Sequence, residues 1–208
     1  PNAGQSVGSS TPKVETPKYE PRAAVAEPSP EPSTPIVPSK AVAEKQGDIA
    51  VYFSPHGGCT EAICKAIGEA KKKVRIQAYS FTSAPVAKAL IDAQKRGVEV
   101  IAVLDKSNRS DRYSSATFLK NQGAAVVIDA SHQIAHNKII LIDDDVLITG
   151  SFNFSKNAEE NNAENVLIIR EHPEVFSRYA ANFAEHFEHS KPYEGIAKPV
   201  SEKPEDKP

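Results

Sequence analysis

Apolar and polar residues alternate in blocks between residues 49 and 189, and the blocks predict an ordered succession of strands and helices. In the first half, short apolar runs rich in Val and Ile are separated by stretches with helical periodicity. They predict strands over 49–53, 74–81, 98–104 and 124–128, and helices over 60–70, 83–97 and 117–122. Ser83 is expected to cap the second helix, and Gly123 to end the third. Strands that alternate with helices indicate a sheet covered on both faces.

The rhythm changes after residue 130. Two apolar runs, 138–142 and 146–149, are separated by three consecutive aspartates and predict a tight hairpin. A further strand is predicted over 164–169, and an amphipathic closing helix over 173–189. The apolar side of that helix is expected to consist of Val175, Phe176, Tyr179, Phe183 and Phe187. The predicted fold class is therefore α/β, with a mixed central β-sheet flanked by helices on both faces.

Proline divides the 208-residue chain into three parts. Nine of its 16 prolines lie within residues 1–38 and four more follow residue 191. Residues 1–47 are therefore predicted to be a disordered Pro-rich linker, 48–190 the folded domain, and 191–208 a disordered tail. About 140 residues suffice to bury a core. No run approaches the roughly 18 apolar residues of a membrane span.

The net charge and the first residue of the sequence carry little information about binding partners or cellular location. The formal net charge is −2, which does not favour a strongly basic nucleic-acid-binding domain. The chain starts at Pro1 and contains no methionine, so we expect that preceding residues, with any targeting segment, were removed. An exported, periplasmic or envelope-associated protein is expected. The Pro-rich segment is then a tether to a membrane or envelope anchor, or else a leader without function.

The residues suited to chemistry concentrate in one segment. His136-Asn137-Lys138 is followed after four residues by Asp143, and after six more by Gly150-Ser151-Phe152-Asn153. At about one-in-twenty usage per position, this coincidence has a chance on the order of 10⁻⁶ in such a chain. Side chains at i and i+2 of a strand project together, so His136 and Lys138 share one face. With Lys138, the hydroxyl of Ser151 and the amide of Asn153 supply donors for phosphate oxygens beside a histidine.

The segment resembles the signature of the phospholipase D superfamily of phosphodiesterases. Residues 162–165, Asn-Ala-Glu-Asn, resemble the acidic stretch of that family, and the likeness extends from about Val51 to His189 and includes residues 78–82, Ala-Tyr-Ser-Phe-Thr. Among its members, the chain resembles the small bacterial endonucleases that carry one signature per chain and act as homodimers. The pattern also occurs once here.

The resemblance implies a mechanism and a role for each residue. One copy of His136 attacks phosphorus to give a phosphohistidine, and a second copy protonates the leaving oxygen and then activates water. Glu164 accepts a hydrogen bond from Nδ1–H of the histidine, as the acid of a triad does. Lys138, Ser151 and Asn153 hold the nonbridging oxygens. Asp143 belongs to the motif, but it has a second interpretation, in which it fixes the hairpin and neutralises a neighbouring cation.

Each residue also has a purely structural interpretation. His136 and Lys138 are then a surface pair, Ser151 and Asn153 cap a helical turn after the hairpin, and Glu164 is an ordinary strand-end carboxylate. The full spacing favours the catalytic interpretation for His136 and Lys138.

Residues outside the motif give weaker indications. Lys106, Arg109 and Arg112 follow the third strand, where ligands of α/β sheets commonly bind, and are candidates for contacts to a phosphate backbone, together with His132. Solvated loops are the alternative for all four. The remaining histidines, His56, His172, His186 and His189, are expected on the rim of the site or in solvent.

Metals and cofactors are not predicted. Cys59 and Cys64 lack the number and spacing of zinc ligands and are expected to be small packed residues. No cluster of Asp and Glu with metal-ligand spacing was found, so the active site is expected to work without a bound metal ion or cofactor.

The sequence thus predicts a metal-independent phosphodiesterase, a non-specific homodimeric endonuclease that cleaves DNA or RNA. A phospholipid-cleaving phospholipase D-type enzyme is the alternative with the same chemistry, although the chain has no Trp and no lone basic amphipathic helix. A non-catalytic nucleic-acid-binding module is the third, and it leaves the histidine, cation and acid unexplained. Phosphate contacts carry no base information, so the motif does not choose between DNA and RNA.

Overall fold

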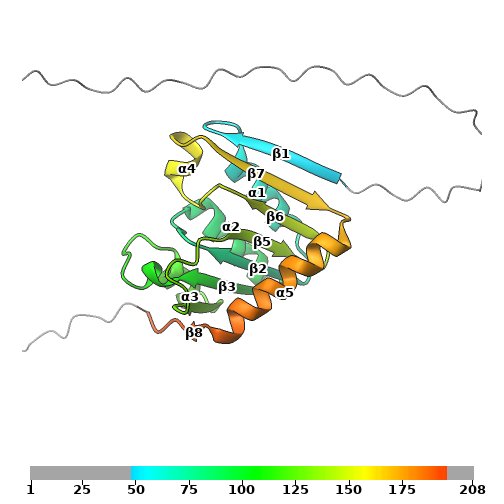
Figure 1. Cartoon of the computed structure of the whole chain (residues 1–208). Helices are drawn as coiled ribbons and strands as arrows, with labels where there is room; N and C mark the ends of the chain where they lie inside the picture. The colour runs from blue at the N-terminus through cyan, green and yellow to red at the C-terminus, as the bar shows by residue number, and fades with distance from the viewer. Residues whose placement is uncertain (1–47, 196–208) are drawn as a thin grey trace, which may run out of the picture. The chain divides into compact units, whose positions relative to one another are not determined.

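Eight strands form one mixed sheet in the computed structural model, which describes residues 48–195 (Figure 1). The strands are β1 (Asp48–Ser54), β2 (Lys73–Ala78), β3 (Glu99–Asp105), β4 (Ala125–Asp129), β5 (Lys138–Ile142), β6 (Val146–Gly150), β7 (Glu164–Arg170) and β8 (Lys191–Pro192). The helices are α1 (Cys59–Glu69), α2 (Ala84–Lys95), η1 (Lys106–Arg109), α3 (Ala116–Asn121), α4 (Lys156–Glu160) and α5 (Pro173–His189). The predicted linker, 1–47, lies outside the described residues.

The strand order is β1-β7-β6-β5-β2-β3-β4-β8. β2, β3 and β4 are parallel, and α2 and the η1–α3 segment make the crossovers between them. β6 pairs antiparallel with β5 on one side and with β7 on the other, and β5 is antiparallel to β2. The predicted α/β class with a mixed sheet is confirmed.

Helices cover both faces of the sheet, as the alternating pattern predicts. On one face, α1, α2 and α3 bury Ile63, Ile67, Leu90 and Leu119 against the strands. On the other, α5 runs across the strands, and its Phe176 and Phe183 pack with side chains that include Val103, Leu141 and Leu147. The two cores hold the strands in register from both sides. No helix within residues 48–195 has the length and hydropathy that a membrane crossing requires.

The helix caps show which local signals were correct. Ser83 caps α2, because its hydroxyl accepts a hydrogen bond from the backbone N–H of Val86. The short α4 after the hairpin is capped by Ser155, which bonds the N–H of Ala158. The interpretation of Ser151 and Asn153 as caps of this turn is therefore wrong.

Two details of the C-terminal part differ from the prediction. Val175 and Phe187 of α5 are 39% and 41% exposed, whereas His186, expected in solvent, is 8% exposed. Residues 191–195 do not resemble the predicted disordered tail, because β8 pairs with β4 and Tyr193 is buried. One large aromatic ring and a free sheet edge are enough to dock this short segment. Residues 196–208 lie outside the described part.

Candidate active site

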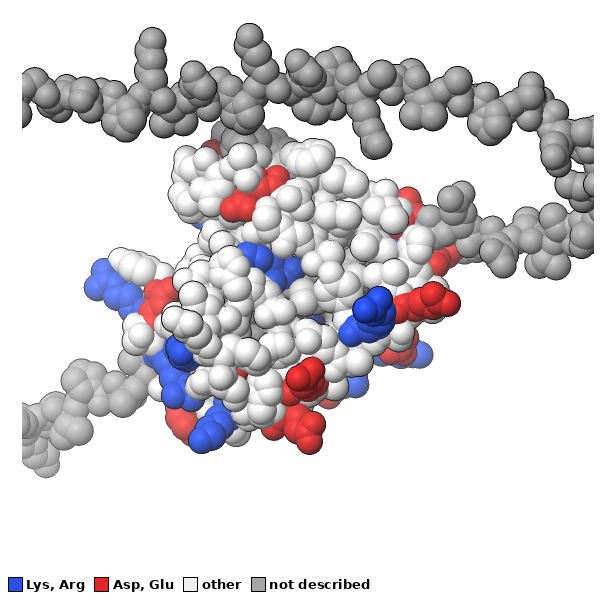
Figure 2. Space-filling model, viewed as in Figure 1, with Lys and Arg blue, Asp and Glu red and all other residues white. Residues whose placement is uncertain are grey.

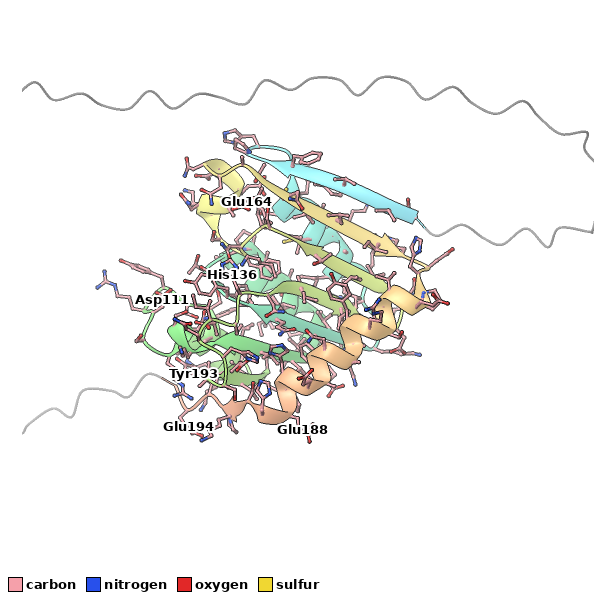
Figure 3. The ribbon with its side chains drawn as sticks, in the orientation of Figure 1. Asp111, His136, Glu164, Glu188, Tyr193 and Glu194 are labelled. Carbon is pink, nitrogen blue, oxygen red and sulfur yellow. The ribbon has the colours of Figure 1, made fainter. Side chains whose placement is uncertain are left out.

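Sheet topology brings the start of β5, the end of β6 and the start of β7 together at one edge of the sheet, the edge along which strands begin and end. β5 begins where the antiparallel β6 ends, and β7 begins beside the end of β6. The segment before β5 carries His136, the segment after β6 carries Ser151 and Asn153, and β7 starts with Glu164. Figure 3 shows His136 and Glu164 at this same edge of the sheet. Of the six residues predicted as catalytic, five therefore gather here.

His136 lies at the surface, directly before β5. Its ring packs against that of Tyr79 with centroids 4.7 Å apart, and the side chain is exposed. The N–H of Tyr79 donates to the carbonyl of Asn137 at 2.9 Å, which ties the end of β2 to this segment. The imidazole thus has one supported face, and the rest of it is accessible to a ligand. Sequence reasoning did not single out Tyr79, although the 78–82 stretch was part of the resemblance.

Lys138 is the buried cation of the site, with 8% of its surface exposed. Its Nζ donates to the backbone carbonyl of His136 at 2.7 Å and lies 5.3 Å from the centre of the Tyr79 ring. Burial lowers the pKa of Lys138, and the negative charge of Glu164 partly opposes that shift. An ammonium group that is partly stripped of water interacts more strongly with an incoming anion than a solvated one does.

Ser151 is held by Asn165 on the neighbouring strand. Its Oγ accepts hydrogen bonds from the backbone N–H and from Nδ2 of Asn165, at 3.1 and 3.3 Å. The hydroxyl proton can therefore point away from Asn165 toward a ligand. Gly150 permits this arrangement, because a Cβ there would lie 2.2 Å from the carbonyl oxygen of Asn165. Asn165 is a positioning residue that the sequence analysis did not list.

Asn153 and Glu164 are the remaining two of the five predicted residues at this edge of the sheet. The Oδ1 of Asn153 is buried and finds no hydrogen-bond partner within residues 48–195. An unpaired buried amide oxygen is costly, and a bound ligand that donates a hydrogen bond to it would satisfy it. Glu164 accepts a hydrogen bond from Nδ2 of Asn162 at 3.0 Å. The hydrogen bond expected between Glu164 and His136 is not among the contacts of the described chain, so that role stays a prediction.

Asp143 lies at the opposite edge of the sheet, because it follows the last residue of β5. Its carboxylate accepts the backbone N–H groups of Lys71, Lys72 and Lys73 at 3.1, 2.7 and 3.0 Å. Its own N–H donates to the carbonyl of Lys73. The structure therefore does not bring Asp143 to His136, and it supports the interpretation in which this residue fixes the hairpin.

The residues predicted to contact substrate divide into two groups. Arg112 extends from an exposed loop with its guanidinium 4.8 Å over the Tyr113 ring, and Arg109 lines a hollow of about 510 Å³ with residues 191–195. Lys106 donates to the carbonyl of His132 at 3.1 Å. These cations follow β3, two strands from β5, on the same edge as the site.

His132 contacts Asp129 rather than a residue of the candidate active site. Its Nδ1 lies 2.9 Å from the carboxylate of Asp129, beside His186 and His189. Its predicted role in substrate binding gains no support from this geometry. The expectation that His186 is solvated is wrong, since the ring is buried against the same carboxylate. A usable signal existed in the sequence, because Asp129 and His132, like His186 and His189, are three residues apart.

Comparison with known proteins agrees with this geometry. The family model described as "Cardiolipin synthase, PLD-like domain" matches residues 63–188. A protein of Rickettsia conorii named phospholipase D is 42% identical over 135 residues, which are 65% of this chain and 67% of the relative. The human mitochondrial cardiolipin hydrolase is 31% identical over 135 residues, 64% of this chain and 52% of that protein.

A solved structure gives the same result. The crystal structure of Nuc from Salmonella typhimurium, described as a phospholipase D family member, has a TM-score of 0.69 and 33% sequence identity to this chain. The match covers 71% of this chain and 99% of Nuc. Together with the family model, which spans more than half of the sequence, the likeness shows that the chain belongs to the phospholipase D superfamily of phosphodiesterases.

Proposed function

We propose that this phosphodiesterase is a metal-independent, non-specific endonuclease that cleaves DNA, RNA or both through a phosphohistidine intermediate in a homodimer. The observation that carries the proposal is the open edge of the sheet, where the exposed ring of His136 and the buried ammonium group of Lys138 both lie against the Tyr79 ring. A polymer backbone can cross such an edge without entering a deep pocket. The likeness to Nuc over 99% of its chain supports the same conclusion.

The proposed chemistry has two displacements. Nε2 of His136 attacks phosphorus, a P–N bond forms, and the bond to the leaving oxygen breaks. A second copy of His136 gives its proton to that oxygen and then accepts a proton from water, which attacks phosphorus and releases the first histidine. Lys138 and the hydroxyl of Ser151 stabilise the charge on the nonbridging oxygens. Glu164 would stabilise the imidazolium electrostatically.

In this proposal the second histidine comes from a second copy of the chain, because the motif occurs once in these 208 residues. An apolar stripe of β1 supports a dimer: Ile49, Val51 and Phe53 alternate along this edge strand and are 50%, 50% and 64% exposed. Exposed apolar stripes of this kind mark contacts with a partner, and a twofold axis lets one stripe meet itself. The expected assembly is therefore isologous.

The charges around the site are mixed in sign. Figure 2 shows lysine and arginine side chains scattered among acidic ones on this face, rather than a continuous basic surface. The exposed Arg112 and Tyr113 offer a cation and an aromatic ring, which suit stacking and phosphate contacts to single strands. We expect moderate affinity with little sequence preference and a clear dependence on salt.

A phospholipid-cleaving enzyme is the second candidate. Relatives named phospholipase D and mitochondrial cardiolipin hydrolase favour it, and the apolar stripe of β1 would then contact a lipid surface. A periplasmic or envelope location, with residues 1–47 as a tether, belongs to either candidate and is tested by fractionating cells that produce the protein.

The test compares substrates side by side. Wild-type protein and the His136→Ala variant are incubated in excess chelator with labelled single- and double-stranded DNA, RNA, and vesicles of cardiolipin or phosphatidylcholine. We expect cleavage of nucleic acid by the wild type and a loss of several orders of magnitude in His136→Ala. Cleavage of lipid alone would assign the second candidate, and nucleic acid binding without any turnover would indicate a non-catalytic module.

A further inference from the structure

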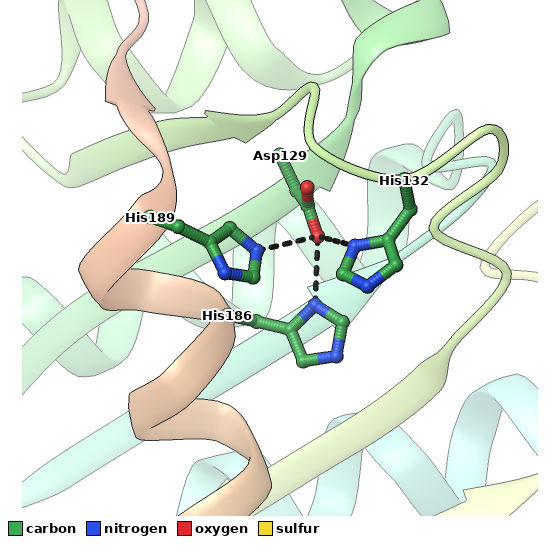
Figure 4. A group of neighbouring side chains, drawn as sticks. All are labelled: Asp129, His132, His186 and His189. Carbon is green, nitrogen blue, oxygen red and sulfur yellow. Dashed lines mark hydrogen bonds and ion pairs between the residues drawn. The ribbon is translucent and has the colours of Figure 1, made fainter.

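Three histidines converge on one buried carboxylate at a distance from the candidate active site. Asp129 ends β4, His132 lies in the loop that follows, and His186 and His189 lie in the last turn of α5 (Figure 4). We call these four residues the Asp129 cluster. Their potential ligand atoms all lie within 4.8 Å of one another. Asp129 is fully buried, and His186 nearly so.

Hydrogen bonds alone do not account for this arrangement. Oδ2 of Asp129 is 2.9 Å from Nδ1 of His132, 2.7 Å from Nδ1 of His186 and 3.2 Å from Nε2 of His189. A carboxylate oxygen has two lone pairs, so the third nitrogen exceeds what it can accept. The Nε2 of His189 is correspondingly buried without a hydrogen bond of acceptable geometry in the described chain.

The donor set is typical of a metal site instead. Three imidazole nitrogens and one carboxylate oxygen are ligands of zinc, which prefers four of them in a tetrahedron. Bonds of about 2.0–2.1 Å place tetrahedral ligand atoms about 3.3 Å apart, close to the three oxygen–nitrogen distances of 2.7–3.2 Å in the cluster. The other oxygen of Asp129 accepts the N–H of Ser131 at 2.9 Å, which fixes the orientation of the carboxylate.

We propose that the Asp129 cluster binds one divalent transition metal ion, with zinc as the best fit. Four protein ligands leave no open position, so the site is structural rather than catalytic. Three strand spacings, about 14 Å, separate β4 from the catalytic strand β5. The inference does not rest on the proposed function, because metal binding and its effect on stability are measured without any substrate.

The ion would connect three parts of the fold. It joins the end of α5 to the end of β4 and to the loop of residues 130–137, which leads into His136. Asp105 already holds this loop at a second point, since its Oδ2 accepts the N–H of Ala135 at 2.8 Å. The metal would therefore fix the loop on which the candidate nucleophile lies, while taking no part in the chemistry.

Metal titration of the untagged full chain tests the proposal. All six histidines lie within residues 48–195, and three of them, His56, His136 and His172, lie outside the cluster, so the variants below separate the two sets. After chelation and dialysis, calorimetric titration with Zn²⁺ should give one equivalent per chain, and Co²⁺ should give the intense visible bands of a tetrahedral ion. The melting temperature should rise by about 5–10 °C at a hundredfold excess of Zn²⁺ over its dissociation constant.

Variants distinguish this site from adventitious binding. Zn²⁺ binding should weaken by more than tenfold in each of two variants, His132→Ala and His189→Ala. His132 lies at an exposed loop position, where a substitution puts folding least at risk. His136→Ala and His56→Asn should retain the full equivalent, since these histidines lie outside the cluster. The proposal is overturned if the wild type binds no stoichiometric Zn²⁺, if Co²⁺ shows only octahedral spectra, or if binding survives in His132→Ala and is lost in His136→Ala.

Discussion

Replacing Asp143 by asparagine should lower the stability of the domain and leave its catalytic rate unchanged. Asparagine keeps the size of the side chain and tolerates the left-handed backbone of this turn, where φ is 52°. It removes the charge and turns an N–H₂ group toward one of the backbone donors that the carboxylate now accepts. The substitution therefore isolates the carboxylate from the shape of the turn.

The contacts of Asp143 give the magnitude. Hydrogen bonds to a charged group contribute about 1.5–3 kcal/mol each. Asparagine can still accept from Lys72 and Lys73 through one oxygen, but it loses the shorter bond from Lys71, keeps only the 3.4 Å one, and weakens the others. Because the carboxylate is partly exposed, we expect a total loss of about 2 kcal/mol, or about 4–8 °C in melting temperature.

The effect should also depend on pH. Burial acts to raise the pKa of Asp143, but the backbone N–H groups of Lys73, Lys72 and Lys71 outweigh it, so the pKa lies below its usual range. A lowered pKa means that the charged carboxylate stabilises the fold above the unfolded value of about 4 and loses this effect as the pH falls through the folded value. The wild type and Asp143→Asn should therefore differ fully at pH 7 and converge below about pH 4.

The assay combines thermal unfolding, followed by circular dichroism, with steady-state hydrolysis of a chromogenic phosphodiester. Asp144→Asn, the neighbouring exposed position in the same turn, is the matched control and should change neither property. A kcat reduced tenfold or more at an unchanged melting temperature would refute the reasoning, because it would return Asp143 to the chemistry.

Three further outcomes are expected. Glu164→Gln should lower kcat more than it raises KM. Because the charge of Glu164 raises the pKa of Lys138, the variant should lose its Lys138 proton, and with it activity, at a lower alkaline pH than the wild type. An unchanged pH–rate profile would exclude that coupling. Gly150→Ala should destabilise the domain by about 2 kcal/mol or more in denaturant unfolding, because the added Cβ would lie 2.2 Å from the carbonyl oxygen of Asn165. The control Gly68→Ala, whose Cβ would enter open space, should not destabilise the domain. Initial rates in excess chelator, measured well below the melting temperature, should stay within about twofold of the untreated rate; recovery that requires Mg²⁺ would contradict a metal-independent reaction.

Local patterns in the sequence determined most of the secondary structure. Periodicity located strands and helices to within a few residues, as for α5 and the β5–β6 hairpin, because side-chain burial repeats with the period of each element. The caps at Ser83 and the break at Gly123 are equally local. Two of the shortest elements, η1 and β8, were not predicted, and α4 was expected only as a helical turn without bounds, because segments of two to five residues contain too few positions for a period to appear.

The pairing of His136 with Lys138 was also determined locally. The two residues are two positions apart, with His136 directly before β5 and Lys138 at its start, and the ammonium of Lys138 donates to the backbone carbonyl of His136. For Asp143 the same motif was misleading, since consecutive positions in a signature do not have to share a site. Five residues of β5 extend about 16 Å, which is enough to carry Asp143 to the other edge of the sheet.

Only the tertiary structure decided which distant residues meet. The alignment of the ends of β5, β6 and β7, and with it the contact of Ser151 with Asn165, depends on strand order and register, which no local pattern contains. The Asp129 cluster joins residues 57 positions apart, because α5 crosses the sheet and ends beside β4. Sequence periodicity indicates which face of an element is buried, but the packing of whole elements against one another selects the neighbour that each side chain finds there.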